Sequence, residues 1–575
     1  MIARRTLLGA MGALPLAGRA MANAATGPVK VFEAARFITM EPSLPSARFV
    51  AVADGMILGL ANSLDELAPW TKGREVQLIR DFAGKVVMPG LIEPHLHPMQ
   101  AAVMLNIPFI APDDWDLPSG NYPGVRTRQD WEARLRAELA RSKADPFVCW
   151  GWHELFHGPL DRAMLDAIAP DRAVVIWQRS FHDIIVNTPM LKAWGLDSQE
   201  AFSAALAAVK ADPQHGDFKR GFFSESALLA SIAKLRPAIL APAHLASGFA
   251  DLKNVLRRKG VTTASDMGTG ILADFATEAG LIRNAFERTD CPARIMLMPI
   301  SVQFTPDQDL DAWLAATSAK YAGAHVRVDR RVKFLADGAF FAQNMRMNAP
   351  GYSDGHLGKW ITPPEVLVPG VRRFWEAGFS LHIHVNGDEG LDVVLGAVEA
   401  LPVRRAQSIT LEHLGYSTEA QNRRIARAGL MVSAQPNYIR VLGDAYGAHG
   451  LGPDRAATIN RLGSLERKGV PLGLHSDFNM APIDPLYLAW IAANRLTLDG
   501  RVLAPDERLT LDKALRAVTI EAAQVIGMDA MVGSIAAGKK ADFTVLSADP
   551  YKLGAARLRE ARVQGVVYEG TWFPS

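Results

Sequence analysis

The sequence contains little cysteine and nothing that marks a disulfide-rich or cysteine-ligated protein. Its 575 residues include two cysteines, Cys149 and Cys291, far apart along the chain. Two cysteines build neither a disulfide framework nor a zinc finger, so both kinds of small scaffold are excluded. An oxidising compartment would allow the two thiols to pair, but we expect them to be free and buried.

Also absent is any concentration of charge of one sign. Lysine and arginine number 62 against 60 aspartates and glutamates, and no long run of like charge or low-complexity segment occurs. No bulk attraction to nucleic acid is therefore expected, and the expected partner is a small-molecule substrate, with a homo-oligomer left open. An apolar fraction of 49% is typical of a globular protein with a substantial core.

The apolar run near the N-terminus, residues 6–18, is too short to span a bilayer. It follows Arg4 and Arg5 and leads to small residues at 22–24, the pattern of a cleavable export signal. The arginine pair resembles a twin-arginine signal, although Ala3 stands where serine or threonine is usual. We therefore predict a signal peptide over residues 1–24 and a periplasmic or secreted protein without a membrane anchor after cleavage. The alternative is an apolar N-terminus that is never cut.

Both ends of the remaining chain have the pattern of β-strands. Residues 28–87 and 533–575 consist of short apolar segments separated by glycine-containing turns. We predict that they assemble into one small β-sandwich domain.

The region between them, residues 88–532, has a different sequence pattern. Apolar runs end in polar residues and alternate with helical patterns such as 391–401 and 418–428, which predicts parallel strands in an α/β fold. The number of runs is the one that closes a (β/α)8 TIM-like barrel, with residues 99–250 as a long insertion after the first barrel strand. The predicted strands are 86–93, 261–266, 294–300, 331–337, 380–386, 408–413, 431–435 and 472–477.

The first of these strands leads to His95 and His97. Residues two apart in an extended segment point to the same side, so both imidazoles can reach one cation. Taken alone, His-x-His is a modest signal, and a pair of surface or core histidines fits it equally well. Its place at the end of an apolar run, where a barrel carries its active site, favours a metal site.

Other strand ends carry residues of the same kind: His384, His413 and Asp477. Lys333 lies inside a strand, where a buried amine needs either a salt bridge or carbamylation, which turns it into an anion able to bridge two metals. Each residue also has a structural interpretation, such as a capping aspartate or a hydrogen-bonded core histidine. Their joint occurrence on strands of one barrel favours a metal-dependent enzyme.

With these motifs the chain resembles the amidohydrolase superfamily, and within it amidohydrolase family 3, the branch that includes N-substituted formamide deformylases. The resemblance covers residues 28–572. The matching segments are 87–97 with His95-Leu96-His97, the stretch around Lys333, His384 with Gly387-Asp388, Glu412-His413, Ser476-Asp477 with 482–485, and 533–542.

The resemblance implies hydrolysis of an amide or cyclic amide carbon–nitrogen bond by a metal-activated hydroxide, without a covalent intermediate. It implies two divalent metal ions, with zinc favoured by the mixed imidazole and carboxylate ligands. His95, His97 and Asp477 would hold one ion, His384 and His413 the other, and a carbamylated Lys333 would bridge them. Asp477 would also take the proton of the attacking water and pass it to the leaving group.

Three further residues are predicted to contact substrate: His182, Glu225 and His475. The sequence departs from the family pattern at Glu93, Pro94, Asn386, Glu389 and His475. These departures remove no ligand, but they leave the substrate open. Two alternatives remain: a mononuclear deaminase of the same superfamily, in which Lys333 is structural, and a catalytically inactive periplasmic binding protein on this scaffold.

Overall fold

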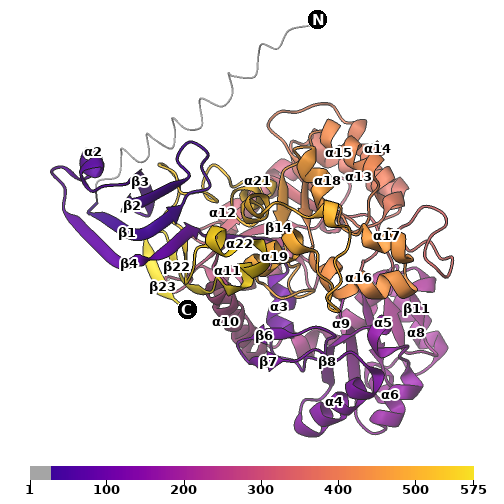
Figure 1. The fold of residues 1–575 in the computed structure, drawn as a ribbon. Helices are drawn as coiled ribbons and strands as arrows, with labels where there is room; N and C mark the ends of the chain where they lie inside the picture. The colour runs from indigo at the N-terminus through magenta and orange to yellow at the C-terminus, as the bar shows by residue number, and fades with distance from the viewer. Residues whose placement is uncertain (1–26) are drawn as a thin grey trace, which may run out of the picture.

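The computed structural model describes residues 27–575, so the predicted export signal lies outside the described residues. Strands from both ends of the chain form one seven-stranded sheet, in the order β23-β22-β21-β4-β1-β2-β3. Figure 1 shows the first strands, in indigo and purple, beside the last, in yellow. The two segments predicted to form a small domain thus share one sheet, and the predicted sandwich is not confirmed. The strands are β1 (Val29–Ile38), β2 (Ser46–Ala53), β3 (Met56–Ala61), β4 (Val76–Pro89), β21 (Phe543–Leu546), β22 (Val563–Tyr568) and β23 (Thr571–Pro574).

The middle of the chain holds two sheets of parallel strands, ordered β15-β14-β13-β5 and β16-β17-β18-β19-β20. Isolated parallel bridges connect them, Ile300 with Lys333 and Leu96 with Phe478. The α/β class is confirmed, but within residues 27–575 the predicted closed barrel takes the form of two arcs rather than one continuous sheet. The strands are β5 (Leu91–Leu96), β13 (Val261–Thr269), β14 (Arg294–Pro299), β15 (Val326–Val328), β16 (Arg331–Leu335), β17 (Ser380–Val385), β18 (Ile409–His413), β19 (Met431–Ala434) and β20 (Leu472–Leu474).

The interruption between β5 and β20 has a local cause. Pro94 lies inside β5 and has no N–H to donate to a neighbouring strand. β20 ends at Leu474, and Asp477 adopts a φ of +55°, which is not extended backbone. A backbone hydrogen bond, from the His97 N–H to the Phe478 carbonyl at 2.9 Å, crosses the gap.

The prediction of residues 86–93 as one barrel strand is wrong, because the chain changes sheets at Gly90. β4 ends in the terminal sheet at Pro89, and β5 begins in the barrel at Leu91. A Cβ atom at Gly90 would lie 2.0 Å from the Thr262 Oγ1, so only glycine fits this crossing.

Helices alternate with the strands of the two arcs, as the sequence pattern predicts. The predicted helices 391–401 and 418–428 correspond to α14 and α15, and a capping box of Thr418 and Gln421 begins α15. The helices of this region are α3 (Pro98–Met104), α10 (Pro242–Arg258), α11 (Phe275–Phe286), α12 (Leu310–Tyr321), α13 (Pro364–Glu376), α14 (Asp388–Glu399), α15 (Glu419–Arg427), α16 (Asn437–His449), α17 (Pro453–Ala457), α18 (Leu462–Arg467), α19 (Pro485–Asn494), α20 (Leu511–Arg516) and α21 (Ile520–Val525). Two short helices, α2 (Ala68–Thr71) and α22 (Pro550–Arg557), accompany the terminal strands.

The insertion has a sheet of its own, ordered β11-β12-β10-β9-β8, and lies at the lower right of Figure 1. Its predicted C-terminal boundary, residue 250, falls inside α10, which packs on α3 so closely that a Cβ at Gly248 would meet the Ala102 carbonyl. The insertion elements are β6 (Trp115–Leu117), β7 (Gly120–Tyr122), α4 (Arg128–Arg141), β8 (Phe147–Trp152), α5 (Glu154–His157), α6 (Arg162–Ile168), β9 (Val174–Gln178), β10 (Asp183–Val186), α7 (Thr188–Trp194), α8 (Gln199–Ala208), β11 (Gly216–Asp217), β12 (Phe222–Ser224) and α9 (Leu228–Ile239).

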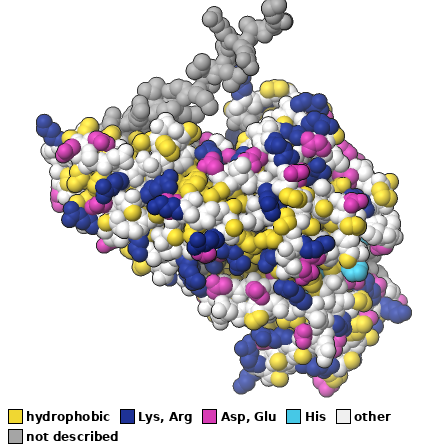
Figure 2. Space-filling model, in the orientation of Figure 1, with side chains coloured by type: hydrophobic (Ala, Val, Ile, Leu, Met, Phe, Trp, Pro, Cys, Tyr) yellow, Lys and Arg dark blue, Asp and Glu magenta, His cyan; other side chains and the backbone are white. Residues whose placement is uncertain are grey.

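Cys149 and Cys291 are free and buried, as expected. No single helix among residues 27–575 is long and apolar enough to cross a membrane. One pair of consecutive helical segments, Glu225–Ile239 and Pro242–Arg258, has the necessary length and composition only when taken together, and the pair is bent by 93°. On the face shown in Figure 2, basic and acidic side chains are interspersed, and neither sign gathers into a large patch.

Candidate metal centre

Three of the predicted ligands meet where β5 and β20 end. His95 and His97 lie two residues apart, and both aim Nε2 at the Asp477 Oδ1, at 3.3 and 3.2 Å. The ligand atoms of these three residues all lie within 4.8 Å of one another. Asp477 reaches this position because its positive φ turns the chain sharply after β20.

The hydrogen bond made by His95 leaves a nitrogen lone pair facing a carboxylate. Burial lowers the pKa of His95 well below its usual value, so its ring is neutral. Its Nδ1 lies 2.7 Å from the Glu412 Oε2 and donates to it, which leaves a lone pair on Nε2 facing the Asp477 carboxylate. The Asp477 Oδ1 and the His97 Nδ1 are buried without a hydrogen-bond partner. A cation between these atoms would remove the repulsion, so the donor set fits a metal ion.

A second group of ligand atoms within 4.8 Å of one another joins His95 and His413 with His475. His413 ends β18, and its Nδ1 lies 3.7 Å from the Asp477 Oδ2 and 3.3 Å from the Gln435 Oε1. His475 is fully buried, and its ring stacks on His95 with centroids 4.4 Å apart. Its Nε2 donates to the Ser433 carbonyl, so the unpartnered Nδ1 carries the lone pair. The structure thus places His475 against His95, a predicted metal ligand, in the buried part of the site.

The remaining predicted ligands lie beside this cluster. The His384 ring is 4.4 Å from the His413 ring, and the Asn386 side-chain amide is 3.1 Å from the His384 Nε2. Lys333 is buried, and its Nζ has no hydrogen-bond partner. Burial lowers the pKa of Lys333 to about 8, against the opposing effect of Glu412 and Asp477. Among the described residues, His384 belongs to neither of the two three-ligand groups.

Glu93 and Ser476 hold the two ligand segments together. The Glu93 carboxyl accepts from the Ser476 N–H at 3.0 Å and from its hydroxyl at 2.8 Å, which ties β5 to the turn that carries Asp477. Burial raises the pKa of Glu93 to about 8, with the Ser476 hydrogen bonds acting in the opposite direction. The departure from aspartate at this position therefore has a structural role.

Sequence reasoning gave no role to Glu412, His382 and Arg331, which lie behind the metal ligands. Glu412 is fully buried between His95 and His382, with 2.7 Å from each ring Nδ1 to a carboxylate oxygen. Burial alone would raise the pKa of Glu412, but the hydrogen bond from His382 and the charge of Lys333 lower it overall. The signal in the sequence was the alternation His382-Ile383-His384, which puts both histidines on one face of the strand.

His182 and Glu225 come from the insertion and form an ion pair of 2.7 Å between the ring Nδ1 and the Glu225 Oε2. Glu225 is also fixed by the side-chain amide of Asn344 at 2.8 Å. The His182 ring lies 6.3 Å from the His384 ring, and its side chain is 23% exposed, compared with 12% for His97 and 10% for Asp477. Burial would lower the pKa of His182, but Glu225 raises it overall. The pair stands at the solvent-facing side of the cluster.

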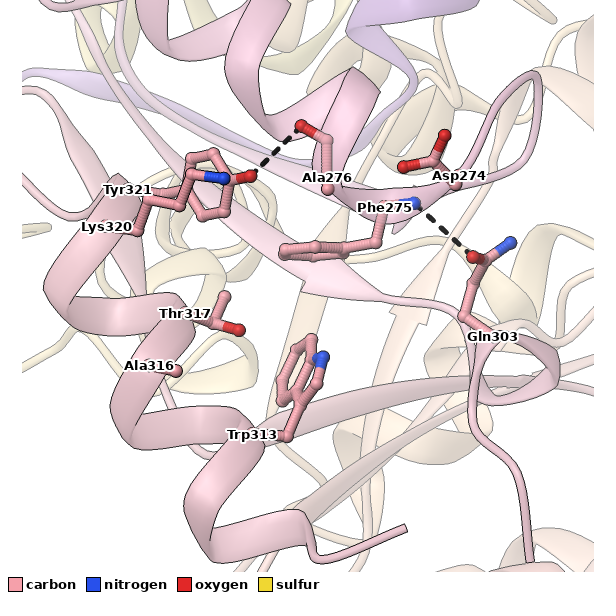
Figure 3. Close-up of a pocket in the computed structure, with 9 residues that line it drawn as sticks. All are labelled: Asp274, Phe275, Ala276, Gln303, Trp313, Ala316, Thr317, Lys320 and Tyr321. Atoms are coloured by element: carbon pink, nitrogen blue, oxygen red, sulfur yellow. Dashed lines mark hydrogen bonds between the residues drawn. The ribbon is translucent and has the colours of Figure 1, made fainter.

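A cavity of about 340 Å³ lies between α11 and α12, on the outer side of the barrel strands. Figure 3 shows Phe275, Trp313 and Tyr321 around it, with the Tyr321 hydroxyl bonded to the Ala276 carbonyl. None of the predicted site residues lines this cavity.

Comparisons with known proteins find similar sequences and structures among amidohydrolases and metal-dependent hydrolases. A profile described as amidohydrolase family matches residues 79–572. The putative amidohydrolase YtcJ of Bacillus subtilis is 25% identical over 531 residues, which cover 91% of this chain and 94% of YtcJ. The N-substituted formamide deformylase of Arthrobacter pascens is 25% identical over 508 residues, 86% of this chain and 89% of that enzyme. An uncharacterized metal-dependent hydrolase from Pyrococcus horikoshii has a similar structure, with a TM-score of 0.66 at 20% identity over 92% of this chain and 99% of that one.

Proposed function

This chain belongs to the amidohydrolase family, and on that premise we propose that it hydrolyses an amide or cyclic amide carbon–nitrogen bond of a small molecule. The observation that carries the proposal is the convergence of the His95 Nε2, the His97 Nε2 and the Asp477 Oδ1, which all lie within 4.8 Å of one another. The deformylase among the relatives supports the carbon–nitrogen bond as the target.

We propose two ion positions. His95, His97 and Asp477 would hold one divalent cation, and His384 and His413 the other. Because His95 has one free ring nitrogen, a single ion uses it, and His475 then supports that ring by stacking. Zinc suits these imidazole and carboxylate donors. A bound cation would lower the pKa of a water molecule and polarise the scissile carbonyl.

Lys333 is the proposed bridge between the ions. Its neutral amine adds to carbon dioxide, a proton leaves, and the resulting carbamate carries a negative charge. The lowered pKa of about 8 supports this step, because a substantial fraction of the amine is then neutral near pH 7 to 8. An unpartnered, buried Nζ is also a group that such a modification would satisfy.

Asp477 is the proposed proton carrier. Its Oδ2 is 3.7 Å from the His413 Nδ1, too long for a hydrogen bond, so it is free to accept the proton of the attacking water. Asp477 then returns that proton to the leaving nitrogen. His182, held by Glu225 at the exposed side, is proposed to contact the substrate through its free ring nitrogen.

The test is metal analysis of the purified protein followed by hydrolysis assays on N-formyl amines, N-acyl amino acids, cyclic amides and esters. About two zinc equivalents per chain and turnover of an amide would support the proposal. About one equivalent together with release of ammonia would instead support the mononuclear deaminase. Ligand binding without turnover of any substrate would favour the inactive binding protein.

The N-terminal sequence motivates a further proposal, that the protein is exported by the twin-arginine route. Replacing Arg4 and Arg5 together with lysine should retain the protein in the cytoplasm, measured by cell fractionation. Unchanged export of this variant would contradict the route.

A further inference from the structure

A line of polar side chains leads from the start of β16 to the proposed metal ligand His95, with Arg331 partly exposed and the other three buried. The Arg331 guanidinium lies 3.2 Å from the His382 Nε2, the His382 Nδ1 lies 2.7 Å from the Glu412 Oε1, and the Glu412 Oε2 lies 2.7 Å from the His95 Nδ1. β16, β17, β18 and β5 each supply one member. We call these four residues the Arg331 relay.

The nitrogen that carries the proton in each histidine of the Arg331 relay can be deduced by starting from Arg331. A guanidinium has only donors, so the His382 Nε2 must accept from Arg331. The neutral His382 ring then carries its proton on Nδ1 and donates it to Glu412. A carboxylate accepts on both oxygens, so Glu412 also accepts the Nδ1 proton of His95. The His95 lone pair is thereby left on Nε2, the atom that faces His97 and Asp477.

The surroundings favour this single arrangement. His382, Glu412 and His95 are at most 1% exposed, so water cannot supply a competing hydrogen bond. Glu412 lies between the two imidazoles, with 2.7 Å from each ring Nδ1 to a different carboxylate oxygen. Asp329 and Asp529 face the Arg331 end. Reversing either imidazole would set a donor against a donor or a lone pair against a carboxylate.

We propose that Arg331 and His382 are positioning residues, which fix His95 with Nε2 free to ligate before any cation binds. This inference rests on the proposed metal-dependent function for its purpose, but not for its test, because the tautomer exists in the metal-free protein. Ligand histidines whose second nitrogen is held by a carboxylate bind metal more tightly, and loss of such a partner typically costs 10- to 100-fold in affinity.

The experiment compares His382→Phe with His382→Gln in metal-free protein labelled with ¹⁵N-histidine. Glutamine keeps one acceptor for Arg331 and one donor for Glu412, whereas phenylalanine keeps neither. We expect the His95 resonances of the wild type and of His382→Gln to show an unprotonated Nε2. His382→Phe removes the hydrogen bond that orients Glu412 toward His95, so both His95 tautomers should be populated. Zn²⁺ binding, measured by chelator competition, should weaken by up to about 10-fold, the lower end of the range for loss of a direct carboxylate partner.

His157→Phe is the matched control, because His157 is a buried histidine bonded at both nitrogens but belongs to α5 in the insertion. It should leave Zn²⁺ affinity unchanged. Arg331→Met tests the same relay from its far end and serves if His382→Phe does not fold. Unaltered His95 tautomer and Zn²⁺ affinity in His382→Phe or Arg331→Met would overturn the relay. A wild type that shows the predicted tautomer but hydrolyses no amide would overturn the proposed function and leave the relay standing.

Discussion

The residues at the strand ends and the pair contributed by the insertion are built differently. His95, His413 and Asp477 are nearly buried, and a network of histidines and carboxylates spanning several strands holds them. His182 is 23% exposed and is held by one ion pair, whose partner is secured by Asn344. The rigid part of the site thus holds the proposed metal ligands, and the less constrained part holds the residues proposed to meet the substrate. Such a division lets loops and insertions change specificity while the reaction is kept.

The largest effect is expected from Asp477→Asn, which removes the proton carrier and a ligand charge from the rigid part. We expect turnover to fall by about 10³-fold or more, since a positioned acid or base contributes 10²- to 10⁴-fold and a ligand is lost as well. Circular dichroism should show an unchanged fold. Asp499→Asn, at an exposed carboxylate, is the control and should keep full activity. Turnover by Asp477→Asn at the wild-type rate would contradict the proposed mechanism.

Lys333→Met should separate the two proposed ions. Methionine preserves the apolar stem but cannot form a carbamate, so bound zinc should drop from about two equivalents to about one. Metal analysis of the purified variant measures this directly. If Lys333→Met keeps both equivalents, the bridge is excluded and the lysine is structural.

In the His182–Glu225 pair of the insertion, His182→Gln should lower kcat/KM by about 10²-fold or less and leave the metal content unchanged. The pKa of His182 is raised and that of Glu225 is lowered. The charged pair is therefore present between these two pKa values. It is lost as pH rises through the raised pKa of His182 and as pH falls through the lowered pKa of Glu225. Substrate affinity should weaken on both sides.

Glu225→Gln sharpens this pH test, because it removes the charge that raises the pKa of His182. The alkaline limb of the KM profile should move to lower pH in this variant. A limb that stays in place would show that His182 does not set it.

The smallest effect on activity is expected from Trp313→Ala, in the outer cavity between α11 and α12 (Figure 3). Trp313 packs edge-on against Phe275 and Phe304, so its loss should lower the free energy of unfolding by about 1–3 kcal/mol. Thermal denaturation measures this change. A change of more than about twofold in kcat/KM would instead link the outer cavity to the site.

The clustering of His95, His97, His413 and Asp477 could be predicted because strand ends concentrate polar residues at one face of a barrel. The period of two along β5 was enough to pair His95 with His97. The Arg331 relay could not be predicted, because it depends on which residues of neighbouring strands lie side by side. Nor could sequence show that His475 stacks on His95, since that requires knowing how the segment after β20 lies against β5.

Contacts between segments distant in the sequence also limited the prediction of the fold. Alternating strand and helix patterns revealed the α/β class, and the β-rich ends revealed that the termini share a sheet. The break between the two arcs depends on Pro94 of β5 lying beside the short strand β20. The sequence does not show that these two segments are neighbours. The change of sheet falls at the turn-forming pair Pro89-Gly90, but the apolar run continues on both sides and was predicted as one strand.

The shared terminal sheet has a consequence for synthesis. β4 pairs with β21, and at this junction the Leu91 N–H donates to the Thr544 hydroxyl, 453 residues further along the chain. At a translation rate of 5–20 residues per second, β4 waits roughly 20–90 s for its partner. Until then one edge of β4 is open to pairing with other chains. Ribosome-bound nascent chains of this protein should therefore need protection by a chaperone until their last strands emerge.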